Sequence, residues 1–421
     1  MKNIVAVRML LLANFISGIA QGISMISIPM YFSDSDQSNW FNIAYGLITL
    51  VTLFWSPYGG TLVDKYDRKR IFLTLNLING VAIGTIAYME WQGLADTSYL
   101  AASVFALTFW NYNLHYPCFY AFMQEITEKE YYNKIASYIE VQSQLATALA
   151  GAAAAFLLGG GLMLNGIDLT FPAWSLAEVF ALDATTYFAS FGIILLLRYV
   201  PMVTRTEETG GVFKRLNTGY QYLIKHPYIF IFGIATHAVF VVVLLHVFNL
   251  APLYVKQHLQ AENANQVFAI SEMFYATGAI LAGLGIQRIF NKTPFVKAIV
   301  ILMFITIGEF IFFISTYWII GFYLVTLLLG VTNAGIRVIR ISYLFTVLPN
   351  HLMGRANSIF FVSNTLGRIL LLALFSLPFF HQDGQVIYAF AILTIFMAIC
   401  ASILLFFYSK IALNKEPDYE N

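Results

Sequence analysis

Long apolar runs follow one another along almost the whole chain, and short polar stretches separate them. An α-helix of about 20 apolar residues crosses the roughly 30 Å hydrocarbon core of a bilayer. The pattern therefore predicts an all-α membrane protein with twelve transmembrane helices. The predicted spans are residues 6–32, 40–63, 71–91, 97–123, 132–161, 174–199, 228–255, 264–289, 295–314, 317–347, 351–378 and 384–409.

The longest polar interruption, residues 201–227, divides six predicted spans from six. It predicts an N-terminal six-helix bundle at 1–200 and a C-terminal six-helix bundle at 228–421, joined by a cytoplasmic loop. Within the loop, residues 212–225 carry apolar and aromatic side chains at helical spacing between basic ones. This spacing suits a short amphipathic helix that lies on the membrane surface.

The composition also indicates a multi-pass membrane protein, because 59% of the residues are hydrophobic and only 11% are charged. Soluble globular chains carry about 25% charged residues. The net charge of +1 and the lack of a basic arm give no indication of a nucleic-acid partner. Cys118 and Cys400 lie inside apolar runs, so we expect inert thiols and no disulfide. With no Walker loop, nucleophile triad or metal-ligand cluster, we expect no enzyme, cofactor or metal.

Basic residues indicate the orientation of the chain in the membrane. With a cytoplasmic N-terminus, 19 of the 23 Lys and Arg fall in cytoplasmic segments, and Lys256 falls outside. Because short cytoplasmic loops carry an excess of Lys and Arg, we expect both termini to be cytoplasmic in a bacterial inner membrane. The three remaining basic residues, Arg337, Arg340 and Arg368, lie in mid-span.

A weak internal repeat supports the division into two halves. A shift of 220 residues aligns Asn113 with Asn333 and Tyr120 with Arg340. A nearly equal shift of 223 residues aligns the loop after the second span with the loop after the eighth. Both shifts respect the predicted topology, so we expect two pseudo-repeated bundles.

The loop between the second and third spans reads "GGTLVDKYDRKRIF" (59–72). A glycine, three residues, an aspartate and a basic cluster in this order resemble the signature loop of the major facilitator superfamily. The variant "DKYDRKR" (64–70) resembles the branch of macrolide-efflux and siderophore-export permeases. Stretches at 181–198, 249–259 and 211–227 are similar to the sixth span, the seventh-span exit and the interdomain segment of that branch.

The resemblance implies two six-helix bundles around a central cavity, a small-molecule substrate and a monomer in the lipid bilayer. It also implies that the signature loop is a conformational latch that does not contact substrate. The implied latch residues are Gly60, Asp64, Lys65, Arg68, Lys69 and Arg70. The carboxylate of Asp64 would favour the N-terminus of a helix, near the cytoplasmic start of span 11.

The chain departs from drug-antiporter relatives at three places. Span 5 has no proline in "TALAGAAAAFLLGGG" (147–161), and span 4 has no arginine in "FWNYNLHYPCFYAF" (109–122). Span 1 has Gln21 where some relatives have an acid. These departures argue against a standard proton-antiport circuit.

Two predicted spans carry arginines on polar faces. Asn333, Arg337 and Arg340 lie at i, i+4 and i+7 of span 10, and Asn364 and Arg368 share a face of span 11. A charged side chain at the bilayer centre costs at least about 2.5–3.5 kcal/mol. Because a guanidinium matches the geometry of a carboxylate, these faces predict a binding site for an anionic group.

The arginines have a structural alternative, in which Arg337 and Arg368 pair with Glu272 or Glu309 and hold the C-terminal half together. Glu272 in span 8 is also the first candidate for a proton-coupling residue, because a buried carboxyl can cycle between its protonated and ionised forms. Glu140 in span 5 is the second candidate. Asp183 in span 6 is the third, although for Asp183 and Glu309 a structural hydrogen bond is the preferred interpretation.

If spans 1, 4, 7 and 10 line the pathway, as in the family, Gln21, Tyr116 and His237 join the candidate substrate contacts. His237 and His246 are nine residues apart and lie on opposite faces of a helix, so we expect no shared metal site.

The leading hypothesis is a secondary active transporter that works by alternating access. It would export a small, anionic, siderophore-like or drug-like molecule, with the proton as coupling ion. Two alternatives stay open: proton-coupled uptake of an anionic siderophore or metabolite, and a non-transporting membrane receptor or scaffold. The arginine faces favour an anionic substrate in either direction, and the branch resemblance favours export.

Overall fold

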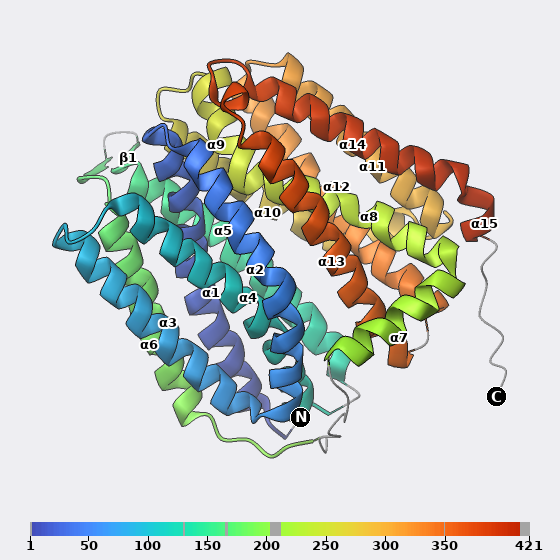
Figure 1. Ribbon diagram of the computed structural model, residues 1–421. Coiled ribbons are helices and arrows are strands. Elements are labelled where there is room, and N and C mark those ends of the chain that lie inside the picture. The colour runs from blue at the N-terminus through green and yellow to red at the C-terminus, as the bar shows by residue number, and fades with distance from the viewer. Residues whose placement is uncertain (1, 129–130, 165–166, 203–211, 349, 413–421) are drawn as a thin grey trace. The chain divides into compact units, whose positions relative to one another are not determined.

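The computed structural model describes residues 2–128, 131–164, 167–202, 212–348 and 350–412. The chain folds into two compact units (Figure 1). Unit 1 comprises Met1–Thr209 and Asn263–Met273, and unit 2 comprises Gly210–Glu262 and Phe274–Asn421. The long helix α10 (Ala264–Ile289) therefore contributes its first turns to unit 1 and its remaining turns to unit 2.

Unit 1 consists of long helices and one short hairpin. Its elements are α1 (Ile4–Asp34), α2 (Ser38–Lys65), α3 (Arg68–Trp91), α4 (Thr97–Ile126), α5 (Tyr132–Leu158), β1 (Gly161–Leu164), β2 (Ile167–Thr170) and α6 (Leu176–Leu196). Helix α1 packs against α4, α5 and α6, and α3 lies beside α6 along much of its length (Figure 1). Helix α1 is thus a central element of this unit.

Unit 2 has a short amphipathic helix followed by long apolar ones. Its elements are α7 (Val212–Lys225), α8 (Pro227–Leu245), η2 (His246–Leu250), α9 (Ala251–Leu253), η3 (Tyr254–His258), the remainder of α10, α11 (Phe295–Ser315), α12 (Ile319–Val347), α13 (Asn350–Phe375), η4 (Pro378–His381), α14 (Val386–Phe406) and α15 (Tyr408–Ala412). The π-helical turns η2 and η3 flank Pro252, which has no backbone N–H to donate. Helix α13 packs against α7 and α8, and α11 packs against α12 and α14.

The helices confirm the predicted spans, counting α8 to η3 as one. No helix bound differs from the prediction by more than three residues; α3, for example, begins at Arg68 and not at 71. Within the described residues, nine helices are long and apolar enough to cross a membrane, and Ile359–Phe375 of α13 is a shorter apolar helix. The helix Val212–Lys225 was also predicted, with the same bounds.

The hairpin β1–β2 was not predicted. Its strands pair antiparallel, with Gly161 opposite Thr170 and Leu164 opposite Ile167. Helix α5 ends at Leu158 because Gly160 adopts φ +73°, a left-handed conformation that favours glycine. The predicted fifth span ran on to residue 161, since glycine in an apolar run carries no hydropathy signal for this turn.

Side-chain caps fix the starts of three helices in unit 1. Asp67 accepts a hydrogen bond from the backbone N–H of Arg70 at 2.9 Å, and Asp96 accepts one from that of Ser98 at 2.8 Å. Ser175 and Glu178 form a reciprocal capping box at the start of α6. These caps satisfy backbone N–H groups that have no partner within the helix.

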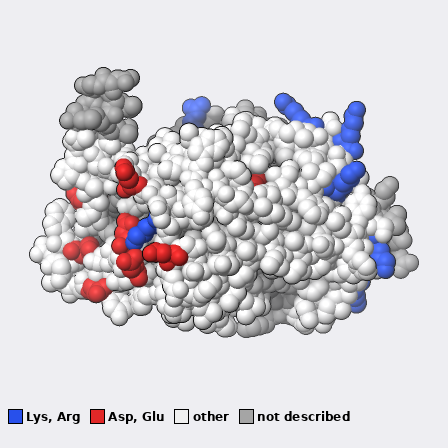
Figure 2. Space-filling model, turned by 90° about the horizontal axis from the view of Figure 1, so that it is seen from above, with Lys and Arg blue, Asp and Glu red and all other residues white. Residues whose placement is uncertain are grey.

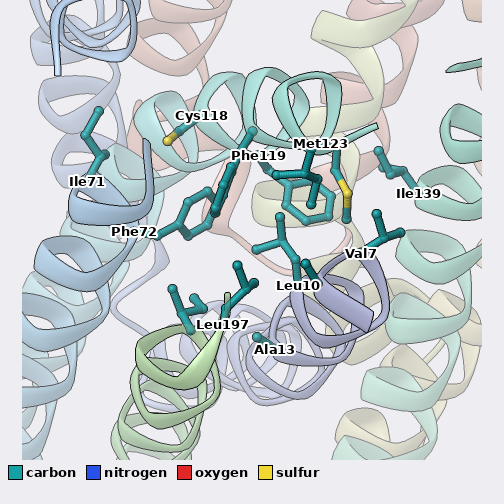
Figure 3. Packing of buried hydrophobic residues seen from close by; sticks show 14 of the residues in the cluster. Val7, Leu10, Ala13, Ile71, Phe72, Cys118, Phe119, Met123, Ile139 and Leu197 are labelled. Carbon is teal, nitrogen blue, oxygen red and sulfur yellow. The ribbon is translucent and has the colours of Figure 1, made fainter. Parts of the chain in front are cut away.

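A hydrophobic cluster occupies the core of unit 1, where α1, α3 and α4 meet (Figure 3). Leu10, Phe72 and Phe119 are almost completely buried in it. Cys118 is also buried there as a free thiol, as expected from its apolar surroundings. The cluster fixes α1 against α4 and thereby positions the polar residues further along both helices.

The outer surface is apolar. Leu196, Leu370 and Phe406 are 73%, 72% and 80% exposed, and the face shown in Figure 2 is largely uncharged. Soluble monomers rarely expose large contiguous apolar areas. This surface is the one a multi-pass membrane protein presents to lipid.

Candidate functional site

Helices α8, α12 and α13 of unit 2 bring three of the predicted site residues together. The Arg340 guanidinium donates to the carbonyl oxygen of Thr236 at 3.2 Å, and the Asn364 amide donates to the carbonyl oxygen of His237 at 3.3 Å. Both acceptors belong to one turn of α8, so α12 and α13 are tied to the same place. We call Thr236, His237, Arg340 and Asn364 the α8 site.

The geometry of α8 makes this approach possible. His237 Nδ1 donates to the carbonyl oxygen of Gly233 at 2.6 Å, and the His237 ring lies 5.4 Å from the ring of Phe360 on α13. A side chain on Gly233 would collide with the Phe360 ring. Because Nδ1 is engaged with its own helix, Nε2 is the nitrogen of His237 left to face a ligand.

Positive charge is concentrated at the α8 site. Arg337 and Arg340 are both half-buried and close enough to interact electrostatically, and Arg340 also interacts with His237. Among the described side chains, Arg68 forms an ion pair with Glu125 in unit 1, whereas Arg340 has no carboxylate partner. A half-buried guanidinium held by a backbone carbonyl is suited to binding an anionic group.

The other predicted residues of α12 and α13 have different surroundings. Arg368 is only 2% exposed, and Asn333 donates to the Tyr275 hydroxyl on α10. The Glu309 carboxylate accepts from the Thr332 hydroxyl, at 3.3 and 3.2 Å from its two oxygens. The predicted structural hydrogen bond of Glu309 is thus present, and its pairing with an arginine stays a prediction.

A second polar cluster lies in the core of unit 1, between α1, α4 and α6. The amides of Gln21 and Asn111 both donate to the Tyr187 hydroxyl, at 2.8 and 3.2 Å. The Ser24 hydroxyl donates to Asp183 Oδ2 at 2.9 Å. All five side chains are at least 95% buried, and we call them the unit 1 network.

Sequence reasoning placed Gln21 and Asp183 at separate sites and missed Ser24, Asn111 and Tyr187. A signal was present in span 1, where Gln21 and Ser24 are three residues apart on the same helical face. The partners on α4 and α6 had no such signal. They lie 76 to 166 residues away in the chain from the groups that they contact.

Tyr116, another predicted contact, is half-buried on α4 with its ring 5.6 Å from that of Tyr112. The neighbouring His115 is buried and lies 2.7 Å from Asn14 Oδ1. The Asn14 amide in turn donates to Gln142 on α5 at 2.8 Å. Sequence reasoning did not identify His115, which links α4 to α1 and α5.

Two of the implied latch residues contact helix ends within unit 1. The Arg68 guanidinium lies 2.8 Å from Glu125 Oε2 and 3.0 Å from the carbonyl oxygen of Ala121, both on α4. The Lys69 ammonium donates to the carbonyl oxygens of Leu195 and Leu197, at 3.0 and 2.8 Å, at the end of α6. Both cations thus join the start of α3 to the ends of neighbouring helices.

The remaining latch and coupling candidates divide in two groups. Arg70 is exposed, and Glu272 is only 5% exposed with no described hydrogen-bond partner for its Oε1 atom. The environment of Gly60 and the side chains of Asp64, Lys65 and Glu140 lie outside the described part of the structure. The roles assigned to these residues stay predictions.

Comparison with known proteins identifies similar sequences and folds. A family model described as Major Facilitator Superfamily matches residues 10–372. The Enterobactin exporter EntS of Salmonella typhi is 24% identical over 376 residues, which cover 87% of this chain and 84% of the relative. The protein of the same name from Citrobacter koseri is 23% identical, with 87% and 83% covered.

Solved structures share the fold. The POT family transporter PepTSo aligns with a TM-score of 0.72 over 97% of this chain and 99% of its own, at 11% identity. The nucleoside transporter NupG aligns with a TM-score of 0.70 over 96% of this chain and 99% of its own, also at 11% identity. At these identities the match shows the fold alone.

Proposed function

The chain belongs to the Major Facilitator Superfamily and is a multi-pass membrane transporter, and we propose that it exports a small anionic molecule of the siderophore class. The proposed location is a bacterial inner membrane, with both termini cytoplasmic. The proposed mechanism is alternating access of a monomer, driven by exchange for protons. The observation that carries the substrate class is Arg340, a half-buried guanidinium without a described carboxylate partner.

Arg340 supports an anionic substrate on energetic grounds. A cation within a membrane span is costly to retain and usually faces a partner, a cavity or a substrate. The guanidinium has five N–H donors, and a single described hydrogen bond, to a backbone carbonyl oxygen, engages it. An anionic group bound there would accept further donors and neutralise the charge.

The surrounding residues have proposed roles of two kinds. Arg337, Arg368, Asn364 and His237 are proposed substrate contacts on α8, α12 and α13. Asn333, whose amide is engaged by Tyr275, is proposed to position α12. Tyr116 of unit 1 stays a proposed substrate contact.

The relatives are named Enterobactin exporter, and this name supports both a siderophore substrate and the outward direction of transport. Enterobactin is therefore the first probe. We expect cells that lack their own exporter to release enterobactin into the medium when they produce this chain. Net accumulation inside the cells would instead support the uptake alternative, and movement in neither direction, of enterobactin or a panel of anionic siderophores, would support the receptor alternative.

The binding-site proposal is tested with Arg340→Ala and Arg340→Lys. Arg288 is an exposed arginine of unit 2, so Arg288→Ala is the matched control. We expect Arg340→Ala to lose export, Arg340→Lys to retain part of it, and Arg288→Ala to behave as the wild type. Equal amounts of folded protein in the membrane are verified by size-exclusion chromatography. Full export by Arg340→Ala would refute an anion site at this arginine.

Proton coupling is proposed from the buried acids, of which Glu272 is the first candidate, followed by Glu140 and Asp183. Glu272 is buried without a described hydrogen-bond partner for one oxygen, as a carboxyl that exchanges a proton would be. Export should therefore stop when an uncoupler collapses the proton gradient. Unchanged export under the uncoupler would show that another energy source drives transport.

The latch implied by Gly60, Asp64, Lys65, Arg68, Lys69 and Arg70 is proposed to act between conformations and not on substrate. In support, Arg68 and Lys69 bond to the ends of α4 and α6 and so couple the start of α3 to both helices. Lys69→Ala should lower the rate of export without changing the enterobactin concentration that gives half the maximal rate.

A further inference from the structure

Two buried oxygen atoms of the unit 1 network have no described hydrogen-bond donor. Asp183 Oδ1 and Asn111 Oδ1 are both buried and have no hydrogen-bond partner within the described chain. The other polar atoms of these residues are engaged: Asn111 Nδ2 donates to Tyr187, and Asp183 Oδ2 accepts from Ser24. Buried acceptors without donors are costly, and a carboxyl can remove this cost at its own oxygen by binding a proton.

The surroundings of the Asp183 carboxyl also favour its protonated form. Asp183 is 0% exposed and accepts a hydrogen bond from Ser24 on α1, and the hydroxyl groups of Tyr112 on α4 and Tyr187 on α6 are close enough to interact with it electrostatically. None of these is a cation. Helix α3, the other close neighbour of α6, meets it at Gly80 and Gly84, which have no side chain to titrate.

An ionised carboxylate in such surroundings would be a buried charge without a counter-ion. A proton on Asp183 neutralises the carboxylate and converts Oδ1 from a buried acceptor without a donor into an O–H donor. We propose that Asp183 is a proton-binding site and that the unit 1 network couples its protonation to the position of helix α1. This inference rests on the proposed proton-driven transport and adds the residue and the helix that carry the coupling.

The link to α1 follows from the arrangement of the hydrogen bonds. Ser24 bonds to Asp183, and Gln21, one turn earlier on α1, bonds to Tyr187 on the same helix α6 as Asp183. A rotation or shift of α1 along α6 therefore changes the hydrogen bonds on both residues together. The ionised form needs the Ser24 donor more than the neutral form does, since hydrogen bonds to a charged acceptor are stronger.

Comparison of the buried acids distinguishes Asp183. The Thr332 hydroxyl lies within hydrogen-bond distance of both oxygens of Glu309, so each of them has a donor within reach. Glu272 has an unpartnered oxygen but no described hydrogen-bonding partner on a second helix that would sense its charge. Asp183 has both an unpartnered oxygen and a bonded neighbour on α1, Ser24.

The experiment uses the full chain in liposomes with enterobactin as the probe. Two rates are measured: accumulation against a concentration gradient driven by a pH difference, and counterflow, which exchanges enterobactin without net proton movement. Asp183→Asn keeps the shape and the bond from Ser24 but binds no exchangeable proton. We expect it to lose driven accumulation and to retain counterflow, whereas the matched control Glu309→Gln retains both. Driven accumulation by Asp183→Asn would overturn the proposal.

A second readout needs no substrate. Infrared titration of the wild type should show a protonated-carboxyl band with a component that disappears at high pH and is missing from Asp183→Asn. Identical titrations of the two proteins would overturn the proposal, and so would loss of the band on adding Na⁺ at constant pH, which would indicate a sodium site. If Asp183→Asn does not fold, Asp183→Glu should restore the band and driven transport with a shifted pH profile.

The two readouts separate the inference from the proposed function. If the wild type shows neither accumulation nor counterflow of enterobactin, the proposed substrate is wrong. The infrared titration then still decides whether Asp183 carries the proton.

Discussion

We expect substitution of Gly278 on α10 or Gly330 on α12 by any larger residue to destabilise unit 2. A Cβ on Gly330 would lie 2.9 Å from the carbonyl carbon of Tyr275 and 3.0 Å from the backbone nitrogen of Ala279, and closer still to the Tyr275 oxygen. Reciprocally, a Cβ on Gly278 would lie 2.9 Å from the carbonyl carbon of Leu327. The obstacles are backbone atoms, which cannot rotate away, so the helices themselves would have to separate.

The size of the effect follows from these distances. Ordinary contact begins at 3.4 Å, so Gly330→Ala requires a movement of at least 3.4 − 2.9 = 0.5 Å, and more to clear the oxygen. Overpacking of this kind costs about 1–3 kcal/mol. The separation would also stretch the hydrogen bond from Asn333 to Tyr275, one turn further along α12. Inside a helix, alanine is otherwise about 1 kcal/mol more stabilising than glycine. Gly330→Ala therefore destabilises the protein only if its steric cost exceeds that gain.

Gly283 on the same helix α10 is the control, because a Cβ there meets nothing within 4 Å. We expect Gly283→Ala to leave the thermal stability of the purified protein unchanged or to raise it. Gly330→Ala should lower the melting temperature, and Gly330→Leu should lower it further. If Gly330→Ala is as stable as Gly283→Ala, the two helices do not cross at these glycines and the reasoning is refuted.

Two further changes test the packing of each unit. Arg68→Ala removes the cation that lies 2.8 Å from the Glu125 carboxylate, which is 4% exposed, and should destabilise the protein by about 3 kcal/mol. This is the low end for a broken buried ion pair, because Arg68 is 18% exposed. The control Arg198→Ala, at an exposed arginine, should melt as the wild type, and equal melting temperatures of the two variants would contradict the ion pair. His246→Phe should leave the melting temperature unchanged or raise it. The buried imidazole stacks 5.2 Å from the Phe313 ring, and neither of its nitrogens has a hydrogen-bond partner among the described residues. A marked decrease of the melting temperature would reveal a hydrogen bond to this ring.

Hydropathy alone was sufficient for the helix bounds, because the thickness of the bilayer sets the length of each apolar run. Caps such as Asp67 and Asp96 refine the starts of α3 and α4 through interactions within three residues. The hairpin after α5 was missed because its turn depends on the backbone conformation of glycines such as Gly160. Local interactions can thus be predicted from a single sequence wherever a side chain, and not the backbone conformation alone, makes them.

The candidate site was predictable only along single helices. Periodicity placed Arg340 on a polar face of α12, yet its contact with the carbonyl oxygen of Thr236 spans 104 residues of sequence. Likewise, the structural hydrogen bond of Asp183 was predicted, but its donor Ser24 lies 159 residues away. A hydrogen bond between helices depends on their rotation about their own axes, and no pattern within one helix determines that rotation.

The internal repeat clarifies how the two halves differ. Asn113 and Asn333 align under the repeat, but the Asn113 amide donates to Phe109 on its own helix, whereas that of Asn333 reaches Tyr275 on another. Tyr120, which aligns with Arg340, is 47% exposed and neutral. The same position has therefore become a cation in unit 2, while unit 1 has a buried carboxyl with no described cation partner. If the α8 site binds the anion and Asp183 binds the proton, each half holds one of the two exchanged species. Removal of the ionisable group at either place should then affect only one of them, so Arg340→Ala should leave the infrared band of Asp183 unchanged.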